Sequence, residues 1–322
     1  MGGFLDKPVT TKATQVGQGK IGEHLVRFGV SGMQGWRMEM EDEHVAVTEV
    51  AGKPVGLFCV FDGHAGKKAA DHASAHIARI LSLQDGFERA ETDPDALGEA
   101  LGETYMDIDV DLLELPKFRD GTDHSGTTAL SVAVTPTHYV FANAGDSRAI
   151  LVGGPSKSVI FSTSDHKPDN PGELARIQKA GATVFERRVN GDLAVSRALG
   201  DFYYKRQADI PPAEQPVSAQ PDVTIVPRNL ATDQFLLLAC DGIWDVMNNE
   251  ACAQFVLDKM NIGYGLGRIC ELLLDHCLEL TSHDNMTAVL VAFPAAPKQI
   301  GTFREPVVRP EATTPAERDS RD

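Results

Sequence analysis

Leu57-Phe58-Cys59-Val60-Phe61-Asp62-Gly63-His64-Ala65-Gly66 is an apolar run that ends in an acid, a glycine and a histidine. A continuous apolar run of this length is typical of a buried strand, so we expect Asp62 where the chain leaves the core. Gly63 has no side chain and therefore lets backbone or a ligand approach closely. By itself, the stretch fits an ordinary strand-to-turn junction as well as a site for metal or proton chemistry.

The chain repeats this pattern of an acidic residue beside an apolar run. Phe235-Leu236-Leu237-Leu238-Ala239-Cys240-Asp241-Gly242 ends as the first stretch does. Five segments bring carboxylates to strand ends, so we expect them to converge on one site. Clustered carboxylates repel one another and are costly to bury, and a bound cation relieves both effects. Oxygen ligands of this kind suit Mg²⁺ or Mn²⁺. The acids beside the other apolar runs are Glu41, Asp42, Asp146, Asp245 and Asp284.

The charge balance excludes one large class of partners. The 322 residues carry a formal net charge of −16, whereas nucleic-acid binding needs a basic surface. The acids are concentrated in residues 85–125, which we interpret as a solvated helical face in preference to a docking surface. None of the five cysteines forms a C-x-x-C pair, and Cys59 and Cys240 lie inside apolar runs. This usage favours reduced core thiols and a cytoplasmic or nuclear protein, and we expect a monomer.

The two ends of the chain have little apolar content. Residues 1–22 are polar and glycine-rich, and we expect a flexible segment; the Gly17-x-Gly19-x-x-Gly22 pattern lacks the strand and helix of a dinucleotide site. Gly2 is a candidate for N-myristoylation, which would give weak membrane contact, although Asp6 replaces the usual Ser or Thr. No signal peptide or transmembrane segment is evident. Residues 297–322 are expected to form a disordered tail.

Between these ends, strands alternate with a few helices. This pattern favours a layered α+β sandwich over a doubly wound sheet. Expected helices lie near residues 68–81, 95–115, 171–180, 249–260 and 266–280, and residues 199–221 read as a long loop. Expected strands lie near residues 25–32, 44–50, 55–61, 128–134, 138–142, 148–152, 159–162, 222–226, 234–239 and 286–293.

The acids and two neighbouring residues would suit phosphoryl transfer. Two hard cations can activate a water and clamp a phosphoryl group. Arg37 can bind phosphate oxygens bidentately, and His64 can protonate a leaving alkoxide. Without the acids, a surface charge and a turn histidine would explain these two residues equally well. Covalent routes fit poorly, because no cysteine has an arginine six residues later and no nucleophile elbow or Walker A loop is present.

Eight motifs occur in one order across about residues 23–296. They are Gly35-Trp36-Arg37-Met38-Glu39-Met40-Glu41-Asp42, Val60 to Gly66, Ser125-Gly126-Thr127-Thr128, Gly145 to Arg148, Asp165-His166-Lys167-Pro168, Val189 to Asp201, Asp241 to Met247 and Ser282 to Met286. Together they resemble the metal-dependent serine/threonine protein phosphatases of type 2C. The resemblance implies a β-sandwich of two antiparallel sheets flanked by helices (α-β-β-α layers), with a binuclear metal site in a cleft at one end.

The resemblance also implies a role for each matching residue. Arg37 would bind the substrate phosphate and His64 would be the general acid. Lys167 and Arg188 match basic residues near the cleft, where solvated loop charges are an equal alternative. The implied ligands are Asp62 bridging two Mg²⁺ or Mn²⁺ ions, Asp241 and Asp284 on one, Glu41 and the Gly63 carbonyl on the other, Asp42 holding water, and Asp146, Asp241 and Asp245 on a weaker third metal.

These inferences predict a catalytic domain over residues 23–296 with a flap at about 165–221. The predicted activity is hydrolysis of phosphoserine and phosphothreonine in phosphoproteins by direct attack of a water bridging two metals. Two alternatives stay open: a metal-dependent phosphatase of small phosphoesters, and a non-catalytic phosphoprotein-binding module of the same fold.

Overall fold

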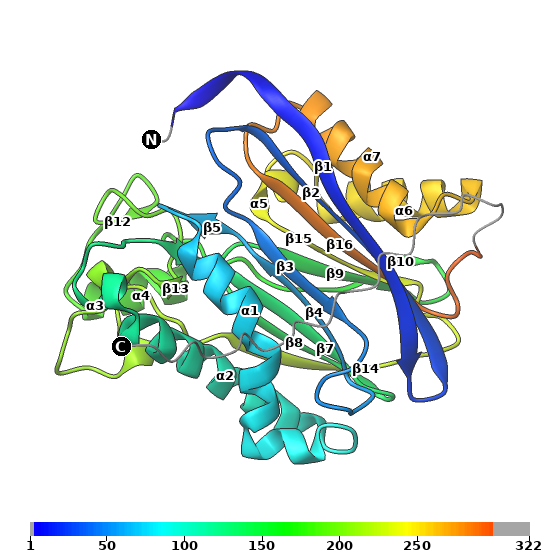
Figure 1. The fold of residues 1–322 in the computed structure, drawn as a ribbon, viewed down its shortest axis with the longest axis horizontal. Coiled ribbons are helices and arrows are strands. Elements are labelled where there is room, and N and C mark those ends of the chain that lie inside the picture. Colours follow the sequence, from blue (N-terminus) through cyan, green and yellow to red (C-terminus); the bar gives the residue numbers. More distant parts are fainter. Residues whose placement is uncertain (1–2, 299–322) are drawn as a thin grey trace, which may run out of the picture.

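The computed structural model describes residues 3–298, which form two antiparallel β-sheets packed against each other with helices on both outer faces (Figure 1). One sheet contains β1 (Phe4–Ile21), β2 (His24–Arg37), β16 (Met286–Ala292), β15 (Phe235–Ala239), β9 (Arg148–Gly153) and β10 (Ser158–Ser162), in that spatial order. The other contains β14 (Asp222–Pro227), β8 (His138–Ala144), β7 (Ala129–Val134), β4 (Gly56–Phe61) and β3 (Glu43–Val47). The α+β sandwich expected from the sequence is confirmed.

The helices cover the outer faces of the two sheets. α1 (Lys68–Leu83) and α2 (Pro94–Glu114) pack on the five-stranded sheet, and α6 (Asn249–Ile262) and α7 (Leu266–Glu279) on the six-stranded one. Two short sheets and several short helices complete the described chain. They are β5 (Gly63–His64) with β6 (Gly126–Thr127) and β13 (Leu199–Gly200); β11 (Val184–Phe185) with β12 (Arg188–Val189); α3 (Pro116–Arg119), α4 (Pro171–Lys179) and α5 (Asp241–Trp244); and the 3₁₀ turns Asp85–Arg89, Phe202–Tyr204 and Pro212–Glu214.

Burial of β4 on both faces explains the apolar run that ends at Asp62. Phe58 and Val60 lie in the core between the sheets, and Cys59 and Phe61 lie in the core under α1 and α2. A strand covered on both faces reads as a continuous hydrophobic run instead of an alternating one. The ring of Phe58 packs edge-on against Phe28 of β2, with centroids 5.8 Å apart, and so joins the two sheets.

The prediction of a flexible segment over residues 1–22 is wrong for the residues that the structure describes. Residues 4–21 form β1, which pairs antiparallel with β2 along most of its length. The glycines serve close packing within this strand, not mobility. A Cβ on Gly17 would lie 2.3 Å from the ring of Phe28, and one on Gly19 would lie 2.0 Å from the hydroxyl of Thr48. The myristoylation candidate Gly2 and residues 299–322 of the predicted tail lie outside the described residues.

The flap predicted at residues 165–221 has a small hydrophobic core of its own. α4 and the β11–β12 hairpin pack around it, and the expected loop at 199–221 contains β13 and two 3₁₀ turns. This core is separate from the two cores of the sandwich. Its buried members are Ile177, Val189, Val195, Ala198 and Val217.

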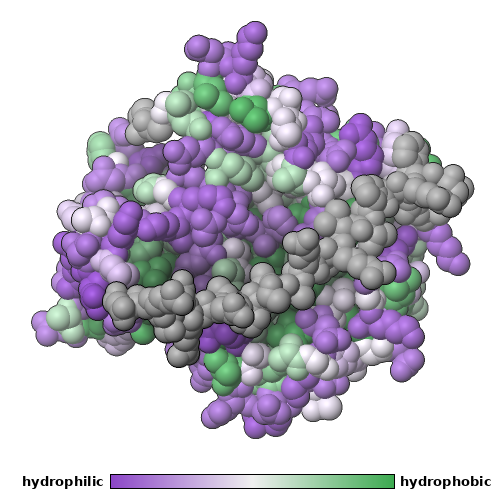
Figure 2. All heavy atoms as spheres, viewed as in Figure 1, coloured by the Kyte–Doolittle hydropathy of each residue, from purple (hydrophilic) through white to green (hydrophobic). Residues whose placement is uncertain are grey.

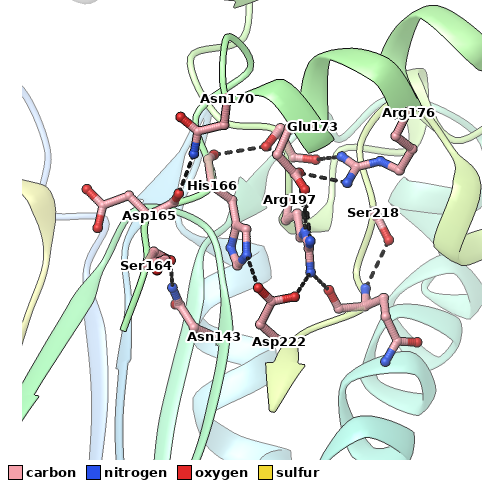
Figure 3. A network of polar contacts seen from close by, with 12 residues as sticks. Asn143, Ser164, Asp165, His166, Asn170, Glu173, Arg176, Arg197, Ser218 and Asp222 are labelled. Atoms are coloured by element: carbon pink, nitrogen blue, oxygen red, sulfur yellow. Dashed lines mark hydrogen bonds and ion pairs between the residues drawn. The ribbon is translucent and has the colours of Figure 1, made fainter. Parts of the chain in front are cut away.

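A polar network that is buried at Glu173 and His166 and exposed at Asp222 ties the flap to the five-stranded sheet (Figure 3). Glu173 accepts hydrogen bonds from Arg176 at 2.7 Å and from Arg197 at 2.8 Å, and Arg197 also binds Asp222 at 2.7 Å. His166 reaches the other oxygen of Asp222 at 3.1 Å. Because Asp222 begins β14, these contacts hold both ends of the flap against one sheet edge.

Three further expectations concern the surface and the thiols. All five cysteines are free and buried, in line with reduced core thiols. Within residues 3–298, no helix has the length and apolarity needed to cross a membrane. The acids of α2 are mostly exposed, as expected for a solvated face, and the surface in Figure 2 is largely hydrophilic. Asp109 is the exception among them, since it is buried and binds Lys205 at 2.7 Å.

Candidate active site

Acidic side chains from both sheets meet at one end of the sandwich. Asp62 follows β4, Asp241 opens α5 just after β15, and Asp284 lies two residues before the start of β16. Burial raises the pKa of Asp62 well above its usual range, and the charges of Asp241, Asp42 and Asp284 raise it further. Burial and neighbouring acids, among them Asp284, likewise raise the pKa of Asp241. The structure thus places these predicted ligands close enough for their charges to interact.

Asp42 carries the least compensated charge of the group. It is only 4% exposed, and its carboxylate oxygens accept no well-aligned hydrogen bond among the described residues, although the Thr287 hydroxyl and the Cys240 thiol are near enough to favour its charged form. Burial raises its pKa to about 7. Oxygens of Asp42 and Asp62 and the sulfur of Cys240 lie within 4.8 Å of one another. A buried unpaired carboxylate is costly, and this arrangement therefore fits a bound cation. Cys240 was not predicted at the site, because its apolar run indicated only a core thiol.

Backbone contacts fix Glu41 and Gly63 beside this group. The Glu41 carboxylate accepts a hydrogen bond from the Gly66 N–H at 2.7 Å, and the Glu41 N–H donates to the Asn285 side chain at 2.9 Å. A Cβ on Gly63 would lie 2.4 Å from the Glu41 carbonyl oxygen, so only glycine fits there. Asn285 also donates to the carbonyls of Gln34 and Glu39. No local sequence pattern indicates this role of Asn285, which depends on segments 244 or more residues apart.

Arg37 lies at the edge of the acidic group. One guanidinium nitrogen binds Asp284 at 2.6 Å, and the side chain is 40% exposed. The other oxygen of Asp284 accepts the Asn285 N–H at 2.8 Å. Because each carboxylate oxygen has a second lone pair, Asp284 can hold Arg37 and also act as a ligand. The guanidinium is therefore half open to solvent beside the acids, where a phosphate could reach it.

His64 is paired with a buried carboxylate that the sequence analysis did not assign. Its Nε2 lies 2.7 Å from Oδ2 of Asp201, which is 5% exposed and has a left-handed backbone with φ of 53°. Burial acts to lower the pKa of His64, but Asp201 and other acids raise it above its usual value overall. A Cβ on Gly126 would lie 2.5 Å from the His64 nitrogen, so glycine is required there too. The only sequence signal for Asp201 was its place at the end of the motif from Val189.

The basic candidates from the flap have different environments. Lys167 forms an ion pair with the buried Asp146 and is also attracted by Asp241 and Asp245. It is therefore part of the acidic end and not a solvated loop charge. Asp245 itself is exposed. Arg188 is exposed in β12 and donates to the Asp192 carbonyl at 2.6 Å within its own hairpin, and no contact joins it to the acids in the described part of the chain.

Comparisons with known proteins agree with this arrangement. The family model described as Protein phosphatase 2C matches residues 26–286. The chain is 44% identical to Protein phosphatase 1B of Mus musculus over 310 residues, which cover 92% of this chain and 77% of that protein. It is 43% identical to Protein phosphatase 1A of Bos taurus, covering 92% and 78% of the two chains. The crystal structure of a phosphatase from Toxoplasma gondii has the same fold, with a TM-score of 0.73 at 24% identity over 90% of this chain and 97% of that one.

Proposed function

The chain belongs to the Protein phosphatase 2C family and is a metal-dependent protein serine/threonine phosphatase, and we propose that it acts through two Mg²⁺ or Mn²⁺ ions at the acidic end of the sandwich. The observation that carries the proposal is the buried carboxylate of Asp42, which accepts no well-aligned hydrogen bond within residues 3–298 and lies beside Asp62. Such a group has a stable place in a folded core only when a cation or a proton neutralises it.

We assign the ligands residue by residue. Asp62 is central because the charges of Asp241, Asp42, Asp284 and Asp146 all act on its carboxylate, and it would be shared by both ions. The ligands of one ion would be Asp241 and Asp284, and those of the other Glu41 and the Gly63 carbonyl. A weaker third ion would use Asp146, Asp241 and Asp245, in competition with the ammonium of Lys167 that now binds Asp146. When bound, the ions lower the pKa of a water and neutralise phosphoryl oxygens.

The remaining steps belong to side chains of this chain. Arg37 would hold the phosphate of the substrate through its open guanidinium edge, as fork-shaped donors do. Asp42 would orient the attacking water and accept its proton. His64 would protonate the leaving serine or threonine oxygen. Asp201 engages Nε2 of His64, so Nδ1 is the nitrogen left to carry the donated proton.

Several aspects of the cellular role remain predictions. The substrates are phosphoproteins, and we assign the enzyme to the cytoplasm or nucleus because five free, buried thiols suit a reducing compartment. Monomeric behaviour and acylation of Gly2 are kept as predictions. For Lys167 and Arg188 we propose contact with substrate from the flap, which Lys167 could make only by exchanging its present partner.

One assay tests the proposal directly. Phosphate release is measured from a phosphothreonine peptide and from a sugar phosphate, with Mn²⁺, with Mg²⁺ and with EDTA. We expect metal-dependent turnover of the peptide, loss of that turnover in EDTA, and little turnover of the sugar phosphate. Asp284→Asn should strongly reduce turnover of the peptide, whereas Asp209→Asn, at an exposed position, should leave this turnover unchanged. Preference for the sugar phosphate would favour the small-molecule alternative, and peptide binding without turnover would favour the non-catalytic module.

A further inference from the structure

The start of β1 lies next to the residue that would hold the substrate phosphate. Phe4 is paired with Arg37 across the β1–β2 ladder, and Cα atoms in such pairs are about 4.5–5.5 Å apart. The ring of Phe4 is 5.7 Å from that of His283, which is 5.8 Å from the ring of Trp36. His283 directly precedes Asp284, the ion-pair partner of Arg37. Figure 1 shows that β1 begins at the same end of the sandwich as β5, which carries His64.

Two large apolar side chains on either side of Arg37 face solvent. Phe4 is 59% exposed and Met38 is 57% exposed. Single exposed apolar residues are ordinary on a protein surface, but here two of them flank one site residue and adjoin a row of packed rings. The side chain of Gln34 donates to the Arg37 and Met38 carbonyls at 2.9 and 3.1 Å. Their backbone is therefore held in place before any substrate arrives.

We propose that Phe4, Trp36 and Met38, here called the apolar rim, bind a bulky apolar side chain of the phosphoprotein substrate close to its phosphorylated residue. This inference rests on the proposed function, because the phosphate held by Arg37 sets the register of the substrate on the rim. An extended peptide advances about 3.3 Å per residue, so an apolar side chain one to three positions from the phosphoresidue can reach the rim. Aromatic rings offer a large contact area to such a partner, and the flexible methionine side chain can adapt to its shape.

A membrane surface is the other apolar partner that such a rim could contact. The net charge of −16 opposes approach to anionic lipid, and Glu39 is exposed directly beside Met38. The ring of His283, which joins Phe4 to Trp36, belongs to the residue that directly precedes Asp284, so the row adjoins the ion-pair partner of Arg37. A peptide is therefore the favoured occupant, and lipid binding becomes an outcome of the test.

The test compares phosphothreonine peptides that differ only in the neighbours of the phosphoresidue. One set carries Phe or Leu at positions one to three on either side, and the reference peptide carries Gly at all of them. Phe4→Ser and Met38→Ser are compared with wild type and with Leu83→Ser. Leu83→Ser is the control, because Leu83 is also an exposed apolar residue, at 69%, but lies at the last position of the 16-residue helix α1 and not beside Arg37. The kcat/KM of each peptide, the turnover of p-nitrophenyl phosphate and the melting temperature are measured at saturating Mn²⁺.

We expect wild type to prefer at least one apolar peptide to the glycine peptide. Phe4→Ser should lower kcat/KM for that peptide about tenfold, because burying part of an aromatic side chain is worth on the order of one power of ten in binding. Phe4→Ser should turn over the glycine peptide and p-nitrophenyl phosphate as fast as wild type does. Leu83→Ser should match wild type on every substrate. Equal turnover of all peptides by wild type, or equal losses on all substrates in Phe4→Ser, would overturn the proposal.

Two further results separate this inference from the function beneath it. Absence of peptide turnover by wild type would refute the proposed function itself, whatever the rim does. Wild type and Phe4→Ser are also sedimented with phosphatidylcholine or phosphatidylserine vesicles. If only wild type sediments with the vesicles, and if it turns over all peptides equally, the apolar rim binds lipid and the substrate role is overturned.

Discussion

The buried carboxylate of Asp42 predicts an unusual pH dependence of stability in the metal-free protein. Burial raises its pKa from 3.8 to about 7, so the folded state binds this proton more tightly than the unfolded state does. A raised pKa of an acid stabilises the fold while the group is protonated. The stabilisation is present below about pH 4 and is lost as pH rises toward 7. Without metal, the protein should therefore become less stable on going from mildly acidic to neutral solution.

The size of the effect follows from the same shift. A difference of about three pKa units corresponds to about 4 kcal/mol of unfolding free energy, at about 1.4 kcal/mol per unit. Asp62 and Asp241 act in the same direction, because their pKa values are raised too. A loss of about 4 kcal/mol is a large share of a typical domain stability of about 5–15 kcal/mol. Saturating Mn²⁺ should reverse the trend, since the metal binds the ionised carboxylates.

Urea unfolding of EDTA-treated protein at pH 5 and pH 8 covers the upper two of these three pKa units, so Asp42 should contribute a loss of about 3 kcal/mol between the two conditions. Asp42→Asn keeps the shape of the side chain and removes the titration, so its stability should depend less on pH. At pH 8 the variant should be more stable than wild type by about 1–3 kcal/mol, after the cost of a buried unpaired amide is subtracted. Asp209→Asn, at an exposed position, is the matched control. A wild-type stability that stays constant or increases from pH 5 to pH 8, or an Asn variant with the wild-type slope, would refute the reasoning.

Substitutions at four other residues test the roles proposed for single side chains. Arg37→Ala should reduce kcat/KM about 10- to 100-fold through the loss of a charge-assisted contact, and Arg37→Lys should restore only part of this loss. Inhibition by inorganic phosphate should weaken in parallel. Unchanged kinetics would make Arg37 a surface charge. Asp62→Asn should lower kcat by at least about two orders of magnitude while the metal-free protein stays folded, as judged by calorimetry; near-normal turnover with unchanged metal affinity would contradict the ligand role. His64→Gln should slow phosphopeptide cleavage by about 10²–10⁴-fold but p-nitrophenyl phosphate cleavage much less, because the nitrophenolate leaves without a proton. Asp201→Asn should share that selectivity, and equal losses on both substrates would leave the pair a purely structural role.

The acidic residues of the site were predictable because each lies next to an apolar run in the same short stretch of sequence. Each buried strand contributes a continuous apolar run, and a carboxylate at its end marks where the core stops, as at Asp62 and Asp241. Helices such as α1 are likewise visible from periodic apolar residues within one segment. Such features need no knowledge of which segments become neighbours.

The features that sequence reasoning missed depend on distant partners. Asp201 meets His64 across 137 residues, and Asn285 reaches Glu41 across 244. The polar, glycine-rich residues of β1 predict a flexible segment, which the structure contradicts. Its strand is defined by β2 and by the side chains that occupy the space above Gly17 and Gly19. No local pattern encodes these contacts, which the folded topology alone supplies.

The distribution of charge explains why stability and activity are linked in this enzyme. The two cations that contact the acidic end in the described chain bind peripheral acids, Arg37 to Asp284 and Lys167 to Asp146. The central acids Asp42 and Asp62 have raised pKa values, and neither forms an ion pair with a lysine or arginine within residues 3–298. A third fixed cation would stabilise the metal-free fold but would occupy the space that divalent ions need. The repulsion among the central carboxylates therefore has to persist in the folded chain, and the free energy released when metal relieves it contributes to metal affinity.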